Sequence, residues 1–268
     1  MGEFDGRVAL VTGGGTGLGR SISERLGAGG AMVLVNYSRS AAEAEETVSA
    51  IRAAGGAAEA VKGDVSTGEG AAALKAAAER HGRLDILVCN AGITKHAPNH
   101  GDLDALTAED FLRIYSVNVV GGFLAAQALK PLLVKTREAS GRAGSILFTS
   151  SIAGTTGIGS SVAYAASKGA LNTMTLSLAR GLAPAIRVNA ICPGFIGTRW
   201  FKDAMDEAAY EAQVKAVEAR VPLGVASGPD DIADAAMFFL SDASRHVTGE
   251  TLHIDAGLHL GFSPLKAR

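Results

Sequence analysis

Short apolar runs alternate with longer helical patterns along almost the whole chain, and this alternation restricts the fold more than any other feature. Seven runs have the length and composition of buried strands: Val8–Val11, Met32–Val35, Ala57–Val61, Ile86–Val88, Ile146–Phe148, Val188–Ile191 and Thr251–Ile254. Helical patterns lie near residues 18–28, 41–54, 69–80, 108–135, 163–182, 200–220 and 230–241. Such alternation predicts a parallel, doubly wound α/β sheet with right-handed crossovers. The 268 residues contain no repeat, linker or low-complexity block, so we expect one domain over residues 1–268.

The composition is that of a soluble globular protein. Hydrophobic residues make up 47% of the chain, and 34 glycines suit a fold with many tight turns between strands and helices. A net charge of −2 gives no electrostatic basis for binding nucleic acid or an anionic membrane. Met1–Gly6 lacks the basic region and apolar core of a secretory signal, and no stretch approaches the ~18 consecutive apolar residues of a membrane span. We therefore expect a cytoplasmic protein.

The first strand leads into a glycine-rich turn, which a helical pattern follows at once. After the β-branched run that begins at Arg7, the residues Thr12, Gly13, Gly17 and Gly19 form the pattern Thr-Gly-x-x-x-Gly-x-Gly. Glycines in this position let the backbone approach a pyrophosphate at the positive end of the helix. The G-x-G-x-x-G fingerprint is absent in every register, so a flexible turn is the alternative. The position between a strand and a helix favours a nucleotide-binding loop.

Tyr164 and Lys168 are four residues apart in a helical pattern, and Ser151 precedes the tyrosine by thirteen residues. Positions i and i+4 lie on one face of a helix, which brings the Lys168 ammonium beside the Tyr164 hydroxyl. A free tyrosine has a pKa of about 10, and a nearby cation lowers this pKa toward the range useful for acid–base catalysis. Taken alone, a Tyr-x-x-x-Lys pair is also typical of a solvated helix face. The pair alone therefore does not indicate a catalytic site, and other motifs in the chain are needed to support one.

Further motifs follow in a fixed order and together carry a family resemblance. They are Asn90–Gly92 after the fourth strand, Asn118 in the next helix and Pro193–Gly194 after the sixth strand. With the glycine turn and the serine, tyrosine and lysine, they resemble the short-chain dehydrogenase/reductase family from Arg7 to about Gly257. The resemblance implies a Rossmann fold whose seven parallel strands have the order 3-2-1-4-5-6-7, with helices on both faces.

The resemblance also implies hydride transfer between a nicotinamide cofactor and a ketone or secondary alcohol. In this family's pattern Tyr164 is the acid–base group, Ser151 binds the oxygen on which charge develops, and Lys168 lowers the tyrosine pKa and binds the nicotinamide ribose. Asn118 holds a water that passes protons to the lysine. The intact set argues against the alternative of a protein that senses nicotinamide redox state without turnover. Ser150 competes with Ser151 for the serine role, and the thirteen-residue spacing favours Ser151.

A cofactor-binding set follows from the same resemblance, in a crevice above the first and fourth strands. Its members are Gly13, Thr16, Gly17, Leu18, Gly19, Arg39, Asp64, Val65, Asn90, Ala91, Gly92, Tyr164, Lys168, Pro193, Gly194, Ile196 and Thr198. Asp64 is placed to contact adenine, although a simple turn aspartate is the alternative. Asn90 flanks the ribose or only holds its turn. Pro193 and Gly194 cover the nicotinamide or only end a strand.

The residues after the second strand favour NADP(H) over NAD(H). NAD-specific folds carry an Asp or Glu there for the ribose 2′-hydroxyl, whereas this chain has Asn36-Tyr37-Ser38. Arg39 follows, and a guanidinium suits a 2′-phosphate by charge and bidentate geometry. An Arg39 that only faces solvent is the alternative. Many NADP-using relatives have a further basic residue where this chain has Thr16, so we expect a modest preference that leaves NAD(H) open.

These motifs do not identify the substrate. The chain resembles 3-oxoacyl-[acyl-carrier-protein] reductases, but Pro184-Ala185 stand where those enzymes carry a basic residue that grips the acidic carrier. Sugars, steroids and other small ketones or alcohols are the alternatives. We expect a substrate lid at about residues 197–220, whose large side chains either line the substrate or serve as core or subunit contacts: Trp200, Phe201, Met205 and Tyr210.

The cysteines and histidines indicate neither a disulfide nor a metal site. Cys89 and Cys192 end the fourth and sixth strands, which the fifth strand separates in this family's sheet, so we expect two buried free thiols. The six histidines lack metal-binding motifs, and Pro98 interrupts the pair His96 and His100. We expect no bound metal.

Two predicted helices are long and apolar on more than one face. They contain Val119–Leu133 and Ala165–Leu182. Such faces call for a partner beyond the sheet, and the family commonly pairs these helices across a two-fold axis. We therefore expect a homotetramer.

Overall fold

A parallel sheet forms the centre of the protein in our computed structural model, which describes residues 2–199 and 206–261. Its seven strands have the expected order β3-β2-β1-β4-β5-β6-β7, and every neighbouring pair is parallel. The strands are β1 (Val8–Val11), β2 (Met32–Tyr37), β3 (Ala57–Lys62), β4 (Ile86–Cys89), β5 (Gly144–Thr149), β6 (Ile186–Pro193) and β7 (Thr251–Ile254). The direction of the strand order reverses between β1 and β4, which opens a crevice at their carboxyl ends.

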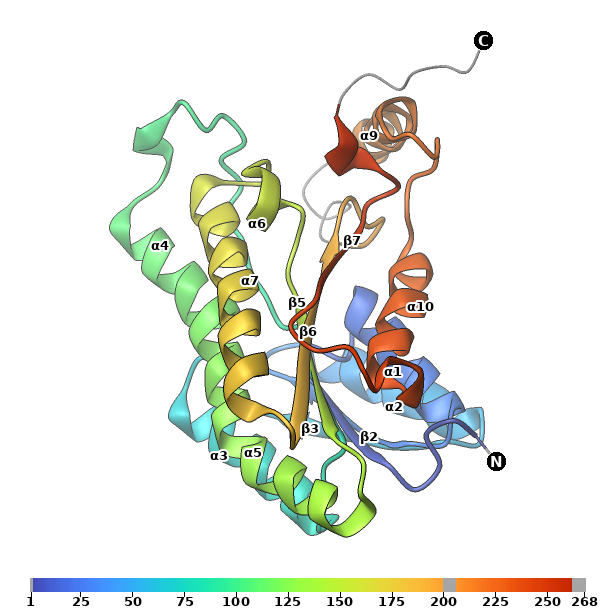
Figure 1. Cartoon of the computed structure of the whole chain (residues 1–268). Helices are drawn as coiled ribbons and strands as arrows, with labels where there is room; N and C mark the ends of the chain where they lie inside the picture. The colour runs from blue at the N-terminus through green and yellow to red at the C-terminus, as the bar shows by residue number, and fades with distance from the viewer. Residues whose placement is uncertain (1, 200–205, 262–268) are drawn as a thin grey trace.

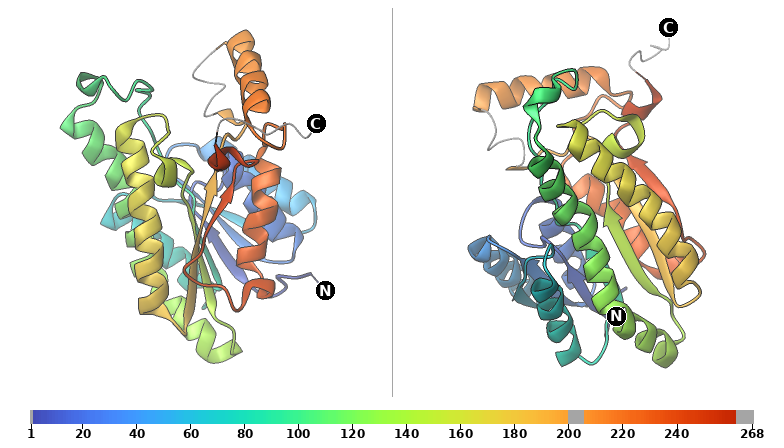
Figure 2. Two further views of the ribbon diagram at one scale, coloured as in Figure 1. Left: turned by 45° about the horizontal axis from the view of Figure 1, so that its top comes forward. Right: turned by 90° about the vertical axis from the view of Figure 1, so that its left-hand side faces the viewer.

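Helices cover both faces of this sheet. They are α1 (Gly17–Ala28), α2 (Ala41–Ala53), α3 (Gly68–Arg80), α4 (Ala108–Tyr115), α5 (Gly121–Ser140), α6 (Ala153–Thr156), α7 (Val162–Leu182), α9 (Glu207–Arg220) and α10 (Pro229–Leu240). Figures 1 and 2 show α3, α5 and α7 on one face and α1, α2 and α10 on the other.

Two hydrophobic cores result from this arrangement, one on each face of the sheet. Alternate strand residues point to opposite faces, so Leu10 and Leu34 join the core under α3, α5 and α7, while Val11 and Val35 join the core under α1, α2 and α10. All four residues of β1 are therefore buried. Burial on both faces explains why the strands are continuous apolar runs in the sequence rather than alternating ones.

The long helix after β4 differs from the prediction in one respect. The pattern over 108–135 predicts one α-helix, whereas the structure has α4, a π-helical turn at Ser116–Val120 and then α5. A π turn adds one residue to a helical turn and rotates everything after it, which a periodicity of 3.6 does not reveal. The short helix α6 is likewise absent from the prediction.

The continuous helix Ala108–Ser140 is also the one described helix that is long and apolar enough to cross a membrane by length and composition. Its side chains Ala125, Leu129 and Leu133 are buried in the core against the sheet. In this fold it is therefore a core helix.

Candidate active site

A continuous cleft of about 1840 Å³ runs along the carboxyl edge of the sheet. This volume exceeds the roughly 300–1,000 Å³ of a pocket for one small ligand, so the cleft has room for two molecules. Its wall includes Gly13, Thr16, Gly17, Leu18, Arg39, Asp64, Val65, Asn90, Ala91, Gly92, Ser151, Tyr164, Lys168, Pro193, Gly194, Ile196 and Thr198. Of the site residues predicted from the sequence, only Gly19 and Asn118 lie behind this wall rather than on it.

Tyr164 and Ser151 meet at the centre of the cleft. Tyr164 lies in the first turn of α7, where its backbone N–H donates to the Ser161 Oγ at 3.2 Å. Ser151 follows β5, and its side chain lies near enough to the Tyr164 hydroxyl to lower the tyrosine pKa as a hydrogen-bond partner. Although part of the tyrosine faces the cleft, burial raises the pKa of Tyr164 to about 12, and the bond to Ser151 acts in the opposite direction. At neutral pH the tyrosine is therefore a phenol with a proton to give.

Lys168 lies one turn further along α7, almost fully buried at 3% exposure. Its Nζ donates to the Thr149 carbonyl oxygen at 2.7 Å and is 5.5 Å from the centroid of the Tyr164 ring. Burial lowers the pKa of Lys168 to about 8. The net pKa of Tyr164 is nevertheless raised, because desolvation of the phenol outweighs the effect of Ser151 and the Lys168 ammonium is directed at Thr149.

The competing serine, Ser150, has a different environment. It is 2% exposed, and its hydroxyl donates to the backbone carbonyl of Lys168 at 3.0 Å. Ser150 therefore ties β5 to α7, and Ser151 is the serine that reaches Tyr164.

Asn118 occupies the π turn behind the cleft. Its Oδ1 accepts the Ile93 N–H at 2.8 Å, and its Nδ2 donates to the Ile93 carbonyl and to the Ser167 Oγ, both at 3.0 Å. A Cβ on Gly92 would be 3.4 Å from the Asn118 Oδ1 and 3.7 Å from the Lys168 Nζ. The amide oxygen and the ammonium therefore flank the same small space beside a glycine. Single π turns of this kind often occur at functional sites.

The glycine turn after β1 has the geometry of an anion site. Gly13 and Gly17 have φ values of +61° and +51°, a conformation that side chains rarely adopt. A Cβ on Gly19 would overlap the Gly13 carbonyl oxygen and lie 2.6 Å from the Asn90 Nδ2, so Gly19 serves close packing rather than direct contact. In the described chain the Thr16 side chain does not cap α1, and the first turn of α1 has no acidic residue. Its backbone N–H groups thus fit a pyrophosphate.

Asn90 holds the turns after β1 and β4 together. Its Nδ2 donates to the carbonyls of Thr12 and Gly13 at 3.2 and 3.3 Å. The Thr12 Oγ1 in turn accepts the N–H groups of Asn90 and Ala91 at 2.9 and 3.1 Å. Asn90 therefore holds its turn, and the residue also contributes to the cleft wall.

Arg39 and Asp64 lie at the β2–β3 end of the cleft. The Asp64 Oδ1 accepts the N–H of Ser66 at 3.0 Å and its hydroxyl at 2.6 Å, so Asp64 is a turn aspartate as well as part of the wall. These bonds to Ser66 are the main reason that the pKa of Asp64 is lowered, and the charge of Arg39 adds a smaller effect. Arg39 is therefore close enough to this end of the cleft to act on a charge there.

The same end contains a basic residue that the sequence did not single out. Lys62 ends β3 opposite Tyr37 and lines the cleft with Arg39. Asn36, by contrast, turns inward and donates to the carbonyls of Val61 and Gly63 at 3.1 and 3.0 Å. A basic residue at the end of the strand next to β2 is the signal that could have identified Lys62.

The segment after β6 crosses over the glycine turn. A Cβ on Gly17 would lie 3.2 Å from the Thr198 Cγ2, which places Thr198 directly against that turn. Beyond it, α9 contributes Gln213, Val217 and Arg220 to the cleft wall. Tyr210 packs against Phe195 with ring centroids 6.5 Å apart. The predicted lid residues Trp200, Phe201 and Met205 lie outside the described residues.

Both cysteines are buried free thiols on strands that β5 separates, as predicted. Burial raises the pKa of Cys89 to about 12 and also raises that of Cys192, so neither is a ready nucleophile. Within residues 2–199 and 206–261, no three His, Cys, Asp or Glu side chains gather in a way that could hold a metal ion.

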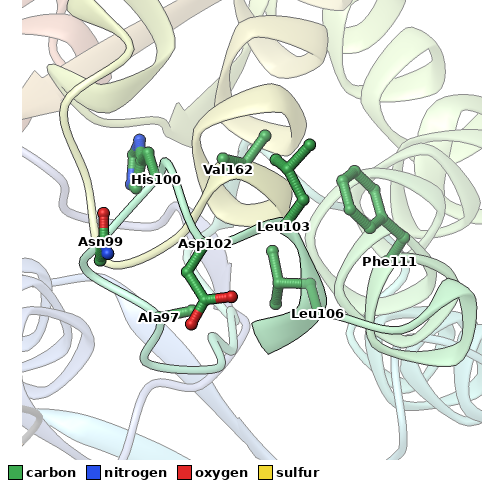
Figure 3. A pocket seen from close by; sticks show the side chains of 8 residues that line it. All are labelled: Ala97, Asn99, His100, Asp102, Leu103, Leu106, Phe111 and Val162. Carbon is green, nitrogen blue, oxygen red and sulfur yellow. The ribbon is translucent and has the colours of Figure 1, made fainter.

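A second cavity, of about 190 Å³, lies behind the loop that joins β4 to α4 (Figure 3). Leu103, Leu106, Phe111 and Val162 form its apolar side. It shares no lining residue with the cleft. The loop is the partition between them. Its residues Thr94, His96 and Pro98 line the cleft, whereas Ala97, Asn99 and His100 line the cavity.

The sheet order and the serine–tyrosine–lysine group at its carboxyl edge define a Rossmann-fold dehydrogenase or reductase. A family model described as enoyl-(acyl carrier protein) reductase matches residues 13–259. The chain is 41% identical over 260 residues to an uncharacterized oxidoreductase of Methylorubrum extorquens, covering 96% of this chain and 100% of that protein. It is 36% identical to glucose 1-dehydrogenase 2 of Bacillus subtilis, covering 98% and 99%. The acetoin dehydrogenase of Salmonella typhimurium superposes with a TM-score of 0.81 at 28% identity, covering 95% and 97%. The chain belongs to the short-chain dehydrogenase/reductase family.

Proposed function

We propose that this protein transfers a hydride between NAD(P)(H) and a small ketone or secondary alcohol, with Tyr164 as the acid–base group. One observation carries this proposal. The Tyr164 hydroxyl lies beside the Ser151 side chain and next to the buried ammonium of Lys168, in the same cleft as the glycine turn.

In carbonyl reduction the phenol of Tyr164 gives its proton to the substrate oxygen, while the Ser151 hydroxyl donates a hydrogen bond to the same oxygen. The nicotinamide, when bound, supplies the hydride. The raised pKa of Tyr164 keeps its proton in place until negative charge develops on the substrate. The Lys168 ammonium then offsets the charge of the phenolate at short range. The space between Lys168, Asn118 and Gly92 is the route by which a water returns the proton in this proposal.

The cofactor set follows the cleft from end to end. The N–H groups of the glycine turn would hold the pyrophosphate, and the segment Pro193–Thr198 would cover the nicotinamide. Arg39 and Lys62 would bind a ribose 2′-phosphate, which supports NADP(H) as the preferred cofactor, with NAD(H) as the alternative. Lys62 is thus a second basic residue beside Arg39, on which the prediction of NADP(H) from the sequence depends.

Among the relatives, glucose 1-dehydrogenase 2 supports a small, polar substrate, because glucose carries a hydroxyl group on the carbon beside its C1. The family model is described as an enoyl reductase with an acyl-carrier-protein substrate, and this shared carrier keeps 3-oxoacyl-[acyl-carrier-protein] reduction as the alternative. In our proposal α9 is part of a substrate lid at about residues 197–220, since Gln213, Val217 and Arg220 line the cleft.

We also propose a homotetramer in the cytoplasm, in keeping with a family of soluble enzymes. A tetramer with two kinds of two-fold contact needs two self-complementary surfaces. Large apolar side chains are exposed on the long helices at Val120, Phe123 and Leu176, and on α10 and β7 at Phe238 and Leu252. Burial of these two sets would satisfy that requirement.

The test is a screen of ketones and secondary alcohols in which absorbance reports NADPH or NADH. Tyr164→Phe is expected to reduce kcat at least ~100-fold while leaving the cofactor Kd within about twofold, because only the hydroxyl takes part in proton transfer. Tyr115→Phe, at the end of α4 and outside the cleft wall, is the matched control. Turnover above a few per cent of wild type in Tyr164→Phe would refute the mechanism, and no hydride transfer across the panel would refute the function.

A further inference from the structure

An aspartate–histidine pair lies on the cleft wall just after the last strand. Asp255 follows β7, and its side chain is 1% exposed. Its carboxylate accepts the backbone N–H groups of Gly257 and His259 at 3.0 and 2.8 Å. The Nδ1 of His259 lies 2.9 and 3.0 Å from the two carboxylate oxygens. A buried carboxylate therefore fixes both the backbone and the ring of His259.

The ring of His259 is oriented from a second direction as well. It stacks on His253 with centroids 4.6 Å apart and planes 19° apart. The His253 Nε2 is itself 2.9 Å from the Thr155 Oγ1. Two independent contacts thus hold a ring that is still 34% exposed and lines the cleft. A ring held in this way is preorganised to contact a ligand.

The tautomer follows from these contacts. A carboxylate only accepts hydrogen bonds, so the His259 Nδ1 carries the hydrogen that Asp255 accepts. In the neutral ring the Nε2 then has a free lone pair. Among the residues that the structure describes, none makes a hydrogen bond to this Nε2. The cleft wall therefore presents a fixed hydrogen-bond acceptor.

This acceptor lies at the Ser151 end of the cleft. Thr155, which contacts His253, belongs to the short helix α6 that begins two residues after Ser151. A Cβ on Gly194 would lie 2.8 Å from the Asp255 Cβ, so the pair also abuts the segment after β6. Arg39, by contrast, follows β2, near the other edge of the sheet. His259 therefore lies at the end of the cleft that contains Ser151, and not at the end that contains Arg39.

We propose that His259 determines substrate specificity by accepting, at Nε2, a hydrogen bond from a second hydroxyl group of the substrate. The substrate class is then a diol, polyol or hydroxyketone. An acyl chain has no donor for the Nε2, and an ammonium group would meet the cations Lys168 and Arg220 of the same cleft. This proposal rests on the proposed function of the cleft and names its substrate class.

The experiment compares cyclohexanol with the cyclohexane-1,2-, 1,3- and 1,4-diols, oxidised with NADP⁺ or NAD⁺. These probes share one ring and one reacting carbinol, and differ in the second hydroxyl. Wild type is expected to use the best diol about tenfold more efficiently than cyclohexanol, judged by kcat/KM. His259→Phe keeps the ring stack and removes the acceptor, so this preference is expected to fall to within about twofold, mainly through a higher KM. His259→Gln, which retains an acceptor oxygen, is expected to restore part of it.

His253→Phe is the matched control, because it also keeps the stack but lies outside the cleft wall. It is expected to leave the diol preference unchanged. Equal preferences in wild type and His259→Phe, or a wild type that favours cyclohexanol, would overturn the proposal.

A second readout separates this proposal from the proposed function. If no probe transfers a hydride, the proposed function fails, and the role of His259 is decided by thermal shift of the protein mixed with NADPH. A diol that raises the Tm of wild type but not of His259→Phe supports the proposal. Equal shifts in both proteins, or no shift by any diol, overturn it.

Discussion

Replacing Lys168 with Met is expected to remove activity and yet to stabilise the protein at neutral pH. In the folded state this lysine is 3% exposed, and its Nζ donates a hydrogen bond to the Thr149 carbonyl at 2.7 Å. Its pKa falls from the ordinary 10.5 to about 8 because burial penalises the charged form. The ammonium charge that the active site requires therefore destabilises the folded state.

The magnitude follows from linkage between protonation and folding. A pKa that falls from 10.5 to about 8 corresponds to about 3 kcal/mol of unfolding free energy. Below pH 8 Lys168 is charged in both states, and the full penalty is present. From pH 8 to 10.5 the unfolded chain binds more protons at Lys168 than the folded chain does, so the contribution of Lys168 to wild-type stability rises with pH. Loss of the bond to Thr149 offsets the gain in Lys168→Met by about 2 kcal/mol, leaving about +1 near pH 7 and about −2 near pH 10.5.

The assay is urea denaturation followed by circular dichroism, at one fixed protein concentration and at several pH values from about 7 to 10.5. The raised pKa of Tyr164 makes stability fall as pH rises from 10 to about 12, but both proteins share this loss and it cancels in their difference. Lys135→Met, which removes an exposed lysine of α5, is the control and is expected to show no such trend. A difference between Lys168→Met and wild type that stays constant across this range would refute the reasoning.

Three further outcomes are expected. Arg39→Ala is expected to lower kcat/KM with NADPH about tenfold and to change that with NADH less than twofold; equal losses with both cofactors would exclude a 2′-phosphate contact. Gly19→Ala, whose Cβ would overlap the Gly13 carbonyl, is expected to cost more than ~2 kcal/mol in urea denaturation and to weaken NADPH binding measured by fluorescence; wild-type values in both would contradict the packing role. Phe123→Asp is expected to dissociate the homotetramer in light scattering, and an unchanged mass would remove that face from the interface.

The strands were predictable because the sheet is buried on both faces, so runs such as Ile86–Val88 are continuously apolar. The π turn at Ser116–Val120 was not, since α4 and α5 each keep an ordinary helical period and only their relative phase changes. Sequence spacing alone therefore placed Asn118 in a helix. It did not reveal that the Asn118 side chain forms hydrogen bonds with Ile93 and Ser167.

The site residues were predictable as positions, but their electrostatics were not. The spacing of Tyr164 and Lys168 correctly places them one turn apart, whereas the direction of the Tyr164 pKa depends on enclosure by segments far away in the chain. Lys62 and His259 were not predicted as site residues, for a related reason. Neither residue belongs to a recognisable local motif. Each lines the cleft only because strands that are distant in the sequence end at the same carboxyl edge of the sheet.

The partition between the cleft and the cavity of Figure 3 has a consequence for protein engineering. Most binding-site walls rest on a close-packed interior, and such walls move little. Here the wall that carries His96 and Pro98 has a partly open space of about 190 Å³ behind it. Larger side chains at Ala97 or Val162 would fill this space and press the loop toward the substrate without adding any atom to the cleft lining. Substrate selectivity in this protein is thus open to change by substitutions at residues that do not contact the ligand.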